Sequence, residues 1–317
     1  MSKFLVAGGA GFIGSHITEH LLDRKHFVRV LDNFCSGKKE NIAFSKEYNS
    51  KQFELIEGDI RDKKVCDKAA KGMDYVLLLA ALRSVPKSFT CPKEYNDVNI
   101  NGTLNMLEAA VKARIKRFVF SSSSSIYGDQ EKFPIKEAAI PKFISPYALT
   151  KQAGENYCRI FSEKDGLETV SLRYFNIFGP RQALDDDYAV VIPKFIKCLI
   201  KNDNPPIFGD GHQSRDFTYV DNVVQANILA ATKPGIKLGV FNVACAEETS
   251  VIKLVDILNK ILKRNIKPVF LKKRPGDIYR TIADISSISK SLGYIPKIRI
   301  EEGLIKTVKH FSDSIKK

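Results

Sequence analysis

Residues 4–32, FLVAGGAGFIGSHITEHLLDRKHFVRVLD, decide the fold. The apolar run 4–7 predicts a first strand, the spacing over 13–23 predicts a helix, and 27–31 predicts a second strand. Between the first strand and the helix, Gly8, Gly11 and Gly14 recur at three-residue spacing. Glycine permits a tight turn that lets main-chain N–H groups approach a pyrophosphate, and the helix N-terminus adds positive potential. Strand, glycine turn and helix together predict a dinucleotide-binding site.

An acidic residue ends the second predicted strand. Asp32 follows the glycines at about the 20-residue spacing at which an acid accepts hydrogen bonds from the adenosine ribose hydroxyls. Its carboxylate would repel a 2′-phosphate, so the sequence favours NAD over NADP. Because the positively charged Lys38 and Lys39 lie nearby in the sequence, NADP is not excluded as the cofactor. Asp59 and Ile60, after the third strand, lie where the adenine ring should rest.

Residues 1–175 alternate between apolar runs and segments of helical spacing. Further strands are predicted at 53–56, 75–80, 117–121 and 169–174, and helices at 63–71, 92–113 and 146–164. Strands separated by helices predict a parallel sheet covered on both faces. The predicted class is therefore α/β, with a doubly wound parallel sheet of the Rossmann type.

After residue 176 the pattern changes. Loops rich in Gly, Pro and Asp interleave with helices predicted at 192–201, 221–232 and 251–262. We interpret this part as a smaller α/β lobe interwoven with the first. The NAD-binding domain is expected to comprise 1–175 and about 216–245, and the substrate-binding lobe about 176–215 and 246–317.

Composition narrows the functional classes. The 317 residues are 44% hydrophobic and 27% charged, which is typical of a soluble globular protein. No apolar run approaches the roughly 20 residues of a membrane span, and we expect a cytoplasmic protein without a membrane partner. The net charge is +14, but the lysines are spread along the chain, so no nucleic-acid partner is expected. The six cysteines are scattered, and the HITEH run at 16–20 lies on the first helix, so no metal is expected.

Tyr147 and Lys151 lie four residues apart, on one face of the predicted helix 146–164. A free tyrosine is a poor base at neutral pH, but a lysine ammonium and an oxidised nicotinamide nearby are expected to lower its pKa. The run Ser121–Ser125 follows the fifth strand, at the sheet edge where ligands bind, and Ser123 or a neighbour could hydrogen-bond a reacting hydroxyl. We expect Tyr147 to take a proton from a substrate hydroxyl while hydride leaves to NAD.

With these elements the chain resembles the extended short-chain dehydrogenase/reductases, and more closely the NAD-dependent UDP-sugar 4-epimerases of the UDP-N-acetylglucosamine type. The resemblance covers nearly the whole chain and includes AGGAGFIGSHI (7–17), AALRSVP (80–86), NINGT (99–103), RYFNIFGPRQ (173–182), IFGDG (207–211), RDFTYVD (215–221) and RPGD (274–277). It implies that C4 of the sugar is oxidised to a ketone, that the sugar turns about its diphosphate, and that the hydride returns to the other face. One departure is Leu78, where relatives commonly carry His.

The resemblance also implies roles for individual residues. Ser123, Tyr147 and Lys151 are expected to be catalytic, with Lys151 on the nicotinamide ribose. NAD is expected to contact Gly8, Gly11, Phe12, Ile13, Gly14, Asp32, Asn33, Ser36, Gly37, Asp59, Ile60, Ala80, Ala81, Arg83, Asn99, Ser121, Tyr147, Lys151 and Tyr174. The UDP-sugar is expected to contact Ser84, Val85, Ser123, Ser124, Ser125, Asn176, Ala189, Val190, Ile207, Phe208, Arg215, Arg274, Asp277 and Thr281. Within that set Ala189, Val190, Ile207 and Phe208 would form the uracil pocket.

Several alternatives stay open or are disfavoured. A UDP-glucuronate 4-epimerase stays open, because its chemistry at C4 is the same. A 4,6-dehydratase pattern has Thr-Asp-Glu, and a decarboxylase usually has Glu at the position of Ser125, whereas this chain has Ser123-Ser124-Ser125. A non-catalytic NAD-binding regulator is less expected, because such proteins generally lack the Tyr or the Lys. The resemblance further implies a homodimer formed through the helices 92–113 and 146–164, and it places the small Thr281 beside C2 of the sugar, where an N-acetyl group needs room. The alternative for Thr281 is an ordinary strand residue.

Overall fold

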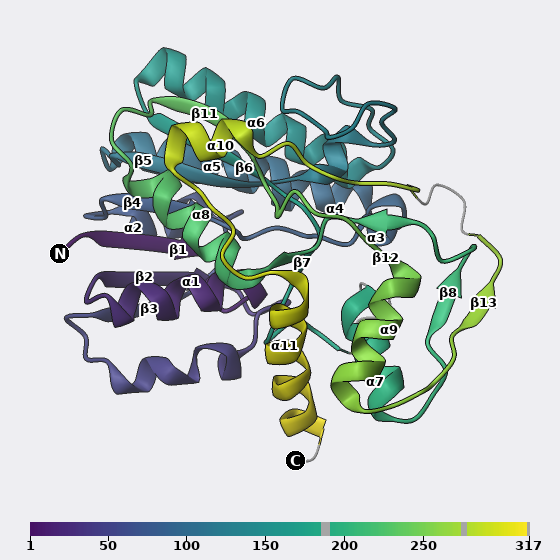
Figure 1. Ribbon diagram of the computed structural model, residues 1–317. Coiled ribbons are helices and arrows are strands. Elements are labelled where there is room, and N and C mark those ends of the chain that lie inside the picture. The colour runs from purple at the N-terminus through teal and green to yellow at the C-terminus, as the bar shows by residue number, and fades with distance from the viewer. Residues whose placement is uncertain (185–190, 274–277, 316–317) are drawn as a thin grey trace.

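A seven-stranded parallel sheet forms the centre of the computed structural model, which describes residues 1–184, 191–273 and 278–315 (Figure 1). The strand order is β11-β6-β5-β4-β1-β2-β3. The bounds are β1 (Lys3–Ala7), β2 (Phe27–Asp32), β3 (Phe53–Glu57), β4 (Tyr75–Leu78), β5 (Arg117–Ser123), β6 (Glu168–Tyr174) and β11 (Leu238–Val243). All neighbouring pairs are parallel. The order reverses between β1 and β4, where doubly wound sheets bind ligands, and the predicted fold class is confirmed.

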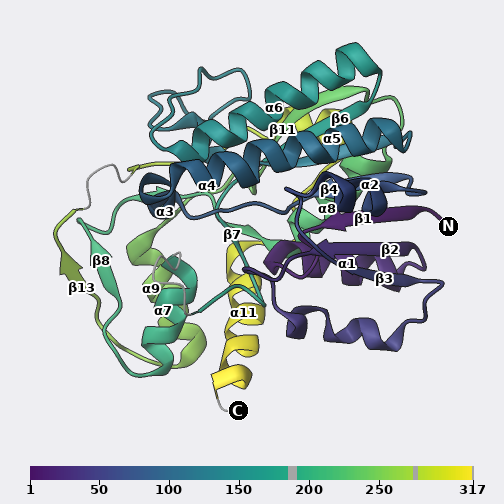
Figure 2. The same ribbon diagram turned by 180° about the vertical axis from the view of Figure 1, so that it is seen from behind.

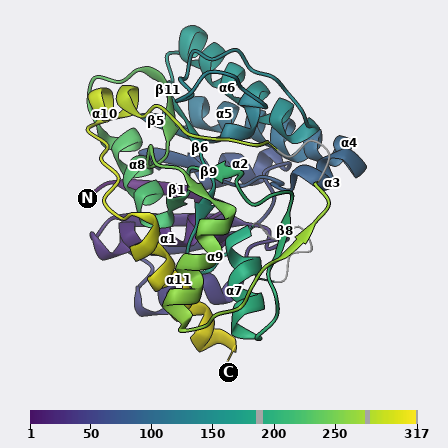
Figure 3. The ribbon, with the colours of Figure 1, turned by 45° about the vertical axis from the view of Figure 1, so that its right-hand side comes forward.

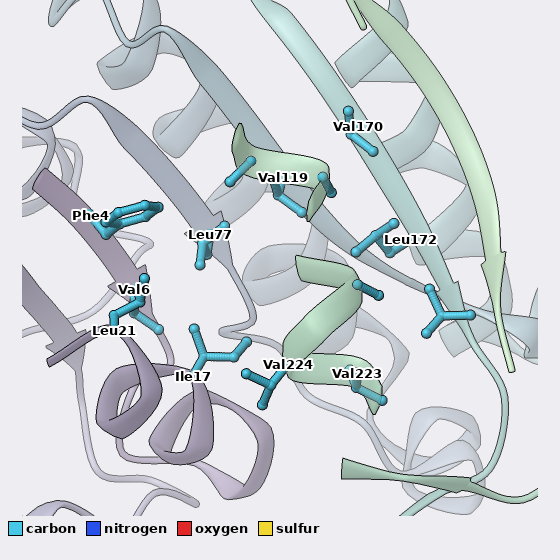
Figure 4. Close-up of a cluster of buried hydrophobic side chains, with 14 of the residues drawn as sticks. Phe4, Val6, Ile17, Leu21, Leu77, Val119, Val170, Leu172, Val223 and Val224 are labelled. Atoms are coloured by element: carbon cyan, nitrogen blue, oxygen red, sulfur yellow. The ribbon is translucent and has the colours of Figure 1, made fainter. Parts of the chain in front are cut away.

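Helices cover both faces of the sheet. One face carries α1 (Phe12–Asp23), α8 (Val220–Thr232) and α10 (Ser286–Leu292), and the other carries α2 (Lys63–Ala70), α5 (Gly102–Lys112) and α6 (Pro146–Asp165), as Figures 1 and 2 show from opposite sides. Figure 4 shows Ile17 and Leu21 of α1 packing toward the sheet, since residues four apart share one helix face. These buried apolar layers hold the carboxyl ends of the strands in fixed positions.

The smaller lobe lies to one side of the sheet (Figure 3). It contains α7 (Val191–Ile200), α9 (Val251–Leu262), α11 (Ile300–Ile315) and the paired strands β8 (Pro206–Phe208) and β13 (Val269–Leu271). Its core includes Phe195, Leu254 and Leu304. Two short strand pairs are separate from the seven-stranded sheet: β7 (Ile177–Phe178) with β10 (Thr218–Tyr219), and β9 (Ser214–Arg215) with β12 (Thr249–Ser250). The division at the boundaries given above stays a proposal; α10, which it assigns to this lobe, packs Ile288 and Leu292 into the core of the sheet.

Three elements differ from the sequence expectations. β4 ends at Leu78, because the N–H groups of Leu79 and Ala80 both donate to Ala7 O and the chain leaves the ladder. The helix expected at 92–113 consists of α4 (Pro92–Asn96), a π-helical turn (Asp97–Asn101) and α5. The serine run does not follow β5: Ser121–Ser123 are its last residues, and Ser124–Tyr127 form a 3-10 helix. β11 and α11 were not expected as elements, and α3 (Val85–Thr90) precedes α4.

Within the described ranges, no helix has the length and apolar character needed to cross a membrane.

Candidate active site

The glycine turn packs tightly against the exit of β4. Gly8 has φ of +84°, and a Cβ placed on it would lie 2.6 Å from Ala80 N. A Cβ on Gly14 would overlap the carbonyl oxygen of Gly8, so the first turn of α1 rests directly on the glycine turn. Both positions therefore require glycine, and the main chain stays open to a ligand at the N-terminus of α1.

Asp32 holds the glycine turn from the end of β2. One carboxylate oxygen accepts from Ala10 N at 2.9 Å and the other from Phe34 N at 2.9 Å. Burial raises the pKa of this carboxyl group. An ionised carboxylate has about four acceptor positions, so Asp32 retains capacity for ribose hydroxyls. Nearby, Arg61 binds Asp59 and lowers its pKa to about 2, while Asn33 Nδ2 donates to Asp59 at 2.7 Å.

A cavity of about 560 Å³ runs from this turn to the ends of β5 and β6. It is lined by all of the residues expected to contact NAD except Asn99. The glycine cradle, the acid at the end of β2 and the tyrosine–lysine pair thus lie around one cavity, and these residues fit a bound dinucleotide.

Asn99 lies behind the cavity wall. It is 2% exposed, and its amide accepts from Leu82 N at 2.8 Å and donates to Leu82 O at 3.0 Å. It also donates to Thr150 Oγ1 at 3.0 Å. Asn99 therefore ties the loop after β4 to α6 and supports the wall of the cavity. The π-helical turn that contains it places the side chain there, as single π turns in helices often do at functional sites.

Lys151 is buried and directed at the end of β5. Its ammonium donates to Ser121 O at 2.8 Å and lies 5.9 Å from the centre of the Tyr147 ring. Burial lowers the pKa of Lys151 to about 8, and Glu155 opposes that shift. Lys151 is therefore an ammonium ion that neutralises readily above neutral pH.

The pKa of Tyr147 differs from the sequence expectation. Burial raises it, and the groups that pull it down are the hydrogen bond with Ser123 and the positive charge of Arg83. Lys151 was expected to lower this pKa, but its ammonium is engaged with the Ser121 carbonyl. In the chain alone Tyr147 is therefore a phenol, and the positive charge of a bound oxidised nicotinamide would favour the phenolate.

The serines at the end of β5 have separate partners. Ser121 Oγ lies 3.0 Å from Tyr174 OH, and Ser122 Oγ donates to Glu155. Ser123 hydrogen-bonds Tyr147, and its Oγ also accepts from Ser125 N at 3.2 Å, which caps the 3-10 helix. Ser125 Oγ is buried and has no hydrogen-bond partner among the described residues.

The structure brings together part of the expected substrate site. Asn176 Nδ2 donates to Asp216 O at 3.0 Å and to Thr281 Oγ1 at 3.3 Å, and Arg215 Nη1 donates to Tyr279 O at 3.2 Å. Asn176, Arg215 and Thr281 thus lie on connected main-chain segments at the junction of the two lobes. Ser84 caps α3, accepting from Lys87 N at 3.3 Å, and Val85 begins that helix.

Other expected substrate residues lie elsewhere. Ile207 is fully buried in the core of the smaller lobe, so its side chain cannot line a uracil pocket and only its main chain could. Phe208 is half-buried, with the Lys194 ammonium 5.6 Å from its ring centre. None of the expected substrate residues that are described lines the cofactor cavity. Ala189, Val190, Arg274 and Asp277 fall outside the described residues.

Sequence reasoning missed a wall of the cavity. Arg181, His310 and Phe311 line it, the last two from α11. Arg181 Nη2 binds Glu19 at 2.6 Å, and its main-chain N–H donates to His310 Nε2 at 3.2 Å. The motif RYFNIFGPRQ contained Arg181, but no local pattern connects α11 with the glycine turn.

Comparison with known proteins gives the family. The model of the NAD dependent epimerase/dehydratase family matches residues 4–244. A UDP-glucose 4-epimerase of Mycolicibacterium smegmatis is 35% identical over 98% of this chain and 98% of its own. The structure is similar to a UDP-N-acetylglucosamine 4-epimerase from Methanobrevibacter ruminantium M1 in complex with UDP-N-acetylmuramic acid, with a TM-score of 0.94, 41% identity and 99% of both chains covered.

A second similar structure contains NAD together with a UDP-sugar. The UDP-glucuronic acid 4-epimerase from Bacillus cereus, in complex with UDP-glucuronic acid and NAD, has a TM-score of 0.90 and 34% identity, with 98% of this chain and 99% of that chain covered. A UDP-N-acetyl-alpha-D-glucosaminuronate decarboxylase of Bacillus cytotoxicus is also 33% identical over 98% of both chains. The chain therefore belongs to the NAD-dependent epimerase/dehydratase family, as an NAD-using enzyme of the UDP-sugar 4-epimerase type.

Proposed function

We propose that the protein epimerises C4 of a UDP-sugar, with UDP-N-acetylglucosamine and UDP-N-acetylgalactosamine as its main pair and UDP-glucose and UDP-galactose as a second pair. The arrangement that carries the proposal is Tyr147, hydrogen-bonded to Ser123, together with Lys151: Tyr147 and Lys151 line the same cavity as Asp32 and the glycine turn. When bound, NAD supplies a reversible acceptor of hydride.

The chain's own groups handle the proton. Tyr147, as its phenolate, would take the proton of the sugar 4-hydroxyl, and Ser123 would hydrogen-bond the same sugar oxygen as it becomes a ketone. Lys151 would hold a ribose and supply positive charge beside the phenolate. Return of the proton from Tyr147 after the sugar has turned would complete the inversion.

Thr281 supports the choice of the N-acetylated pair. Its side chain is 9% exposed and lies against Asn176 at the junction of the lobes, so a small residue occupies the position expected beside C2. The similarity to a UDP-N-acetylglucosamine 4-epimerase over 99% of the chain points in the same direction. Ser124 and Ser125 provide no carboxylate beside Ser123, which disfavours decarboxylation and 4,6-dehydration.

The test is to incubate the purified protein with separate UDP-sugars and to resolve the products by chromatography. The panel contains UDP-N-acetylglucosamine, UDP-N-acetylgalactosamine, UDP-glucose, UDP-galactose and UDP-glucuronate. Interconversion of the N-acetylated pair without added NAD is expected, because the reaction regenerates its cofactor. Turnover of UDP-glucuronate alone would favour the second candidate, a UDP-glucuronate 4-epimerase. Release of carbon dioxide or loss of water would refute epimerisation.

A further inference from the structure

A buried ion pair lies directly behind the catalytic groups. Arg173, in β6, binds Glu155, in α6, through two bonds: Nε to Oε1 at 2.9 Å and Nη2 to Oε2 at 2.7 Å. The side chains are 7% and 4% exposed. Arg173 Nη1 also donates to Tyr127 OH at 2.8 Å and to Glu137 O at 2.9 Å, and Tyr127 OH donates to Asn242 at 2.6 Å. Each guanidinium nitrogen and both carboxylate oxygens therefore have a hydrogen-bond partner, and the pair is shielded from water.

Successive turns of α6 contact the end of β5. Tyr147 hydrogen-bonds Ser123, Lys151 donates to Ser121 O, and Glu155 accepts from Ser122 Oγ. The residues of α6 lie four apart and share one face of the helix. α6 packs closely there, because a Cβ on Gly154 would overlap the ring of Phe120. Glu155 thus holds Ser122. The residues on either side of Ser122 contact the other two side chains: Ser123 contacts Tyr147, and the carbonyl of Ser121 contacts Lys151.

We propose that Glu155 and Arg173 are positioning residues: their ion pair fixes the carboxyl end of β5 against α6 and thereby sets both the place and the charge of Lys151. The inference rests on the function proposed above. Burying two charges is costly, and two apolar or neutral residues often stabilise a core equally well, so stability alone gives little reason for this pair. The Glu155 anion, one helical turn away, favours the ammonium form of Lys151, and the Arg173 cation offsets that effect, so removing either partner alone would shift the protonation of Lys151.

The charges around Lys151 define the test. The titratable and charged groups on its own helix include Tyr147 and Glu155. Those on the elements packed against α6 or around the cavity include Arg83, Glu94, Tyr95, Tyr127, Arg173 and Tyr174. Glu155 raises the pKa of Lys151 against the effect of burial. Glu155→Gln removes this anion and leaves the Arg173 cation unbalanced, and both changes favour neutral Lys151. Arg173→Gln leaves the Glu155 anion unbalanced and favours the ammonium.

The experiment measures kcat/KM against pH on the UDP-sugar pair that the wild type interconverts. Glu155→Gln should move the alkaline limb down by about one pH unit, Arg173→Gln should move it up by about one unit, and Glu155→Gln/Arg173→Gln should lie between them. The matched control is Glu168→Gln, which breaks the ion pair of Arg117 with Glu168 at the opposite ends of β5 and β6, where Arg117 Nη2 lies 2.6 Å from the carboxylate. Glu168→Gln should lower the thermal stability without moving the alkaline limb of the kcat/KM profile.

A second readout requires no turnover. Competitive acetylation of the full-length protein across pH, followed by mass spectrometry of the Lys151 peptide, reports the pKa of Lys151 in each variant. Opposite shifts in the two single variants support the proposal, even if no UDP-sugar is epimerised and the proposed function fails. Shifts in the same direction, or melting-temperature changes like those of Glu168→Gln with an unmoved Lys151, would show that the pair is structural only. If one single variant does not fold, the other decides, because an unmoved Lys151 pKa in the variant that folds would overturn the proposal.

Discussion

The ammonium of Lys151 donates its hydrogen bond to the main-chain carbonyl of Ser121, at 2.8 Å, and lies 5.9 Å from the centre of the Tyr147 ring. The lysine is therefore fixed by β5, the strand that carries Ser123, rather than by Tyr147. Burial of both side chains keeps Tyr147 protonated and makes Lys151 easy to neutralise in the absence of ligands. The proton-transfer site is thus preorganised but is not yet a strong base.

Tyr147→Phe should keep the fold and the bound NAD and lose most of the turnover. Only the phenolic oxygen, which would accept the proton in its ionised form, is removed, and general base catalysis contributes roughly 10²–10⁴-fold. The measurement is kcat on the N-acetylated pair, with NAD content read from the absorbance of the purified protein. Tyr95→Phe is the control, since the Tyr95 ring lies 6.5 Å from that of Tyr147 and its hydroxyl binds Ser84 O. Near-normal turnover of Tyr147→Phe would refute its role as the base.

The pH dependence of the wild type follows from Lys151. Its pKa is lowered to about 8, so the ammonium is present below that pH and is lost above it. Because the mechanism needs the ammonium beside the phenolate, kcat/KM should fall as pH rises through about 8. Steady-state rates across pH check this, with thermal melts at each pH to separate inactivation from unfolding. If kcat/KM stays level to well above pH 9, the reaction does not require the positive charge of Lys151.

Gly8→Ala should weaken NAD binding. The alanine would have to adopt φ of +84°, and its Cβ would lie 2.6 Å from Ala80 N, so the turn beside the cofactor cavity has to move. Gly72→Ala is a matched control, because Gly72 has φ of +76° but nothing lies within 4 Å of the new Cβ. Both should lose about 1–2 kcal/mol of stability from the left-handed backbone, while only Gly8→Ala should lose NAD affinity by calorimetry. Equal NAD affinity in the two variants would contradict the assigned cradle.

The sequence predicted the parts of the fold that local patterns determine. The strands β1, β2, β5 and β6 and the turn at Gly8 are encoded by contiguous apolar runs and by glycine spacing. The positions of other groups depend on tertiary packing. Asn99 reaches Leu82 only because of a π-helical turn, and Ile207 is buried by helices far away in sequence. The contribution of His310 to the cavity likewise requires α11 to lie beside the glycine turn.

A homodimer is expected through α6 and its neighbours. Leu149 and Ile160 on α6 are 52% and 44% exposed, and they lie about three turns apart on one helix face. An exposed apolar stripe of this kind suits two-fold pairing with a second copy. Light scattering at micromolar concentration should give twice the 35.6 kDa chain mass, and Leu149→Glu should halve it. Ile305→Glu on α11, where Ile305 is 54% exposed, is the control that should remain dimeric. A monomeric wild type would contradict the expectation.

Thr281→Tyr should remove activity on the N-acetylated sugars selectively. Thr281 is 9% exposed and hydrogen-bonded to Asn176 at 3.3 Å, so a tyrosine at this position must displace neighbours or fill the space expected for the N-acetyl group. A change of a few atoms in a binding pocket typically alters substrate discrimination by about 10–200-fold. We therefore expect kcat/KM for UDP-N-acetylglucosamine to fall by at least about tenfold relative to UDP-glucose, and Thr281→Ser, which keeps the hydroxyl near Asn176, to retain the preference of the wild type. An equal loss on both pairs would mean that Thr281 is a structural residue, and retained activity on the N-acetylated pair would show that the tyrosine does not enter the sugar site.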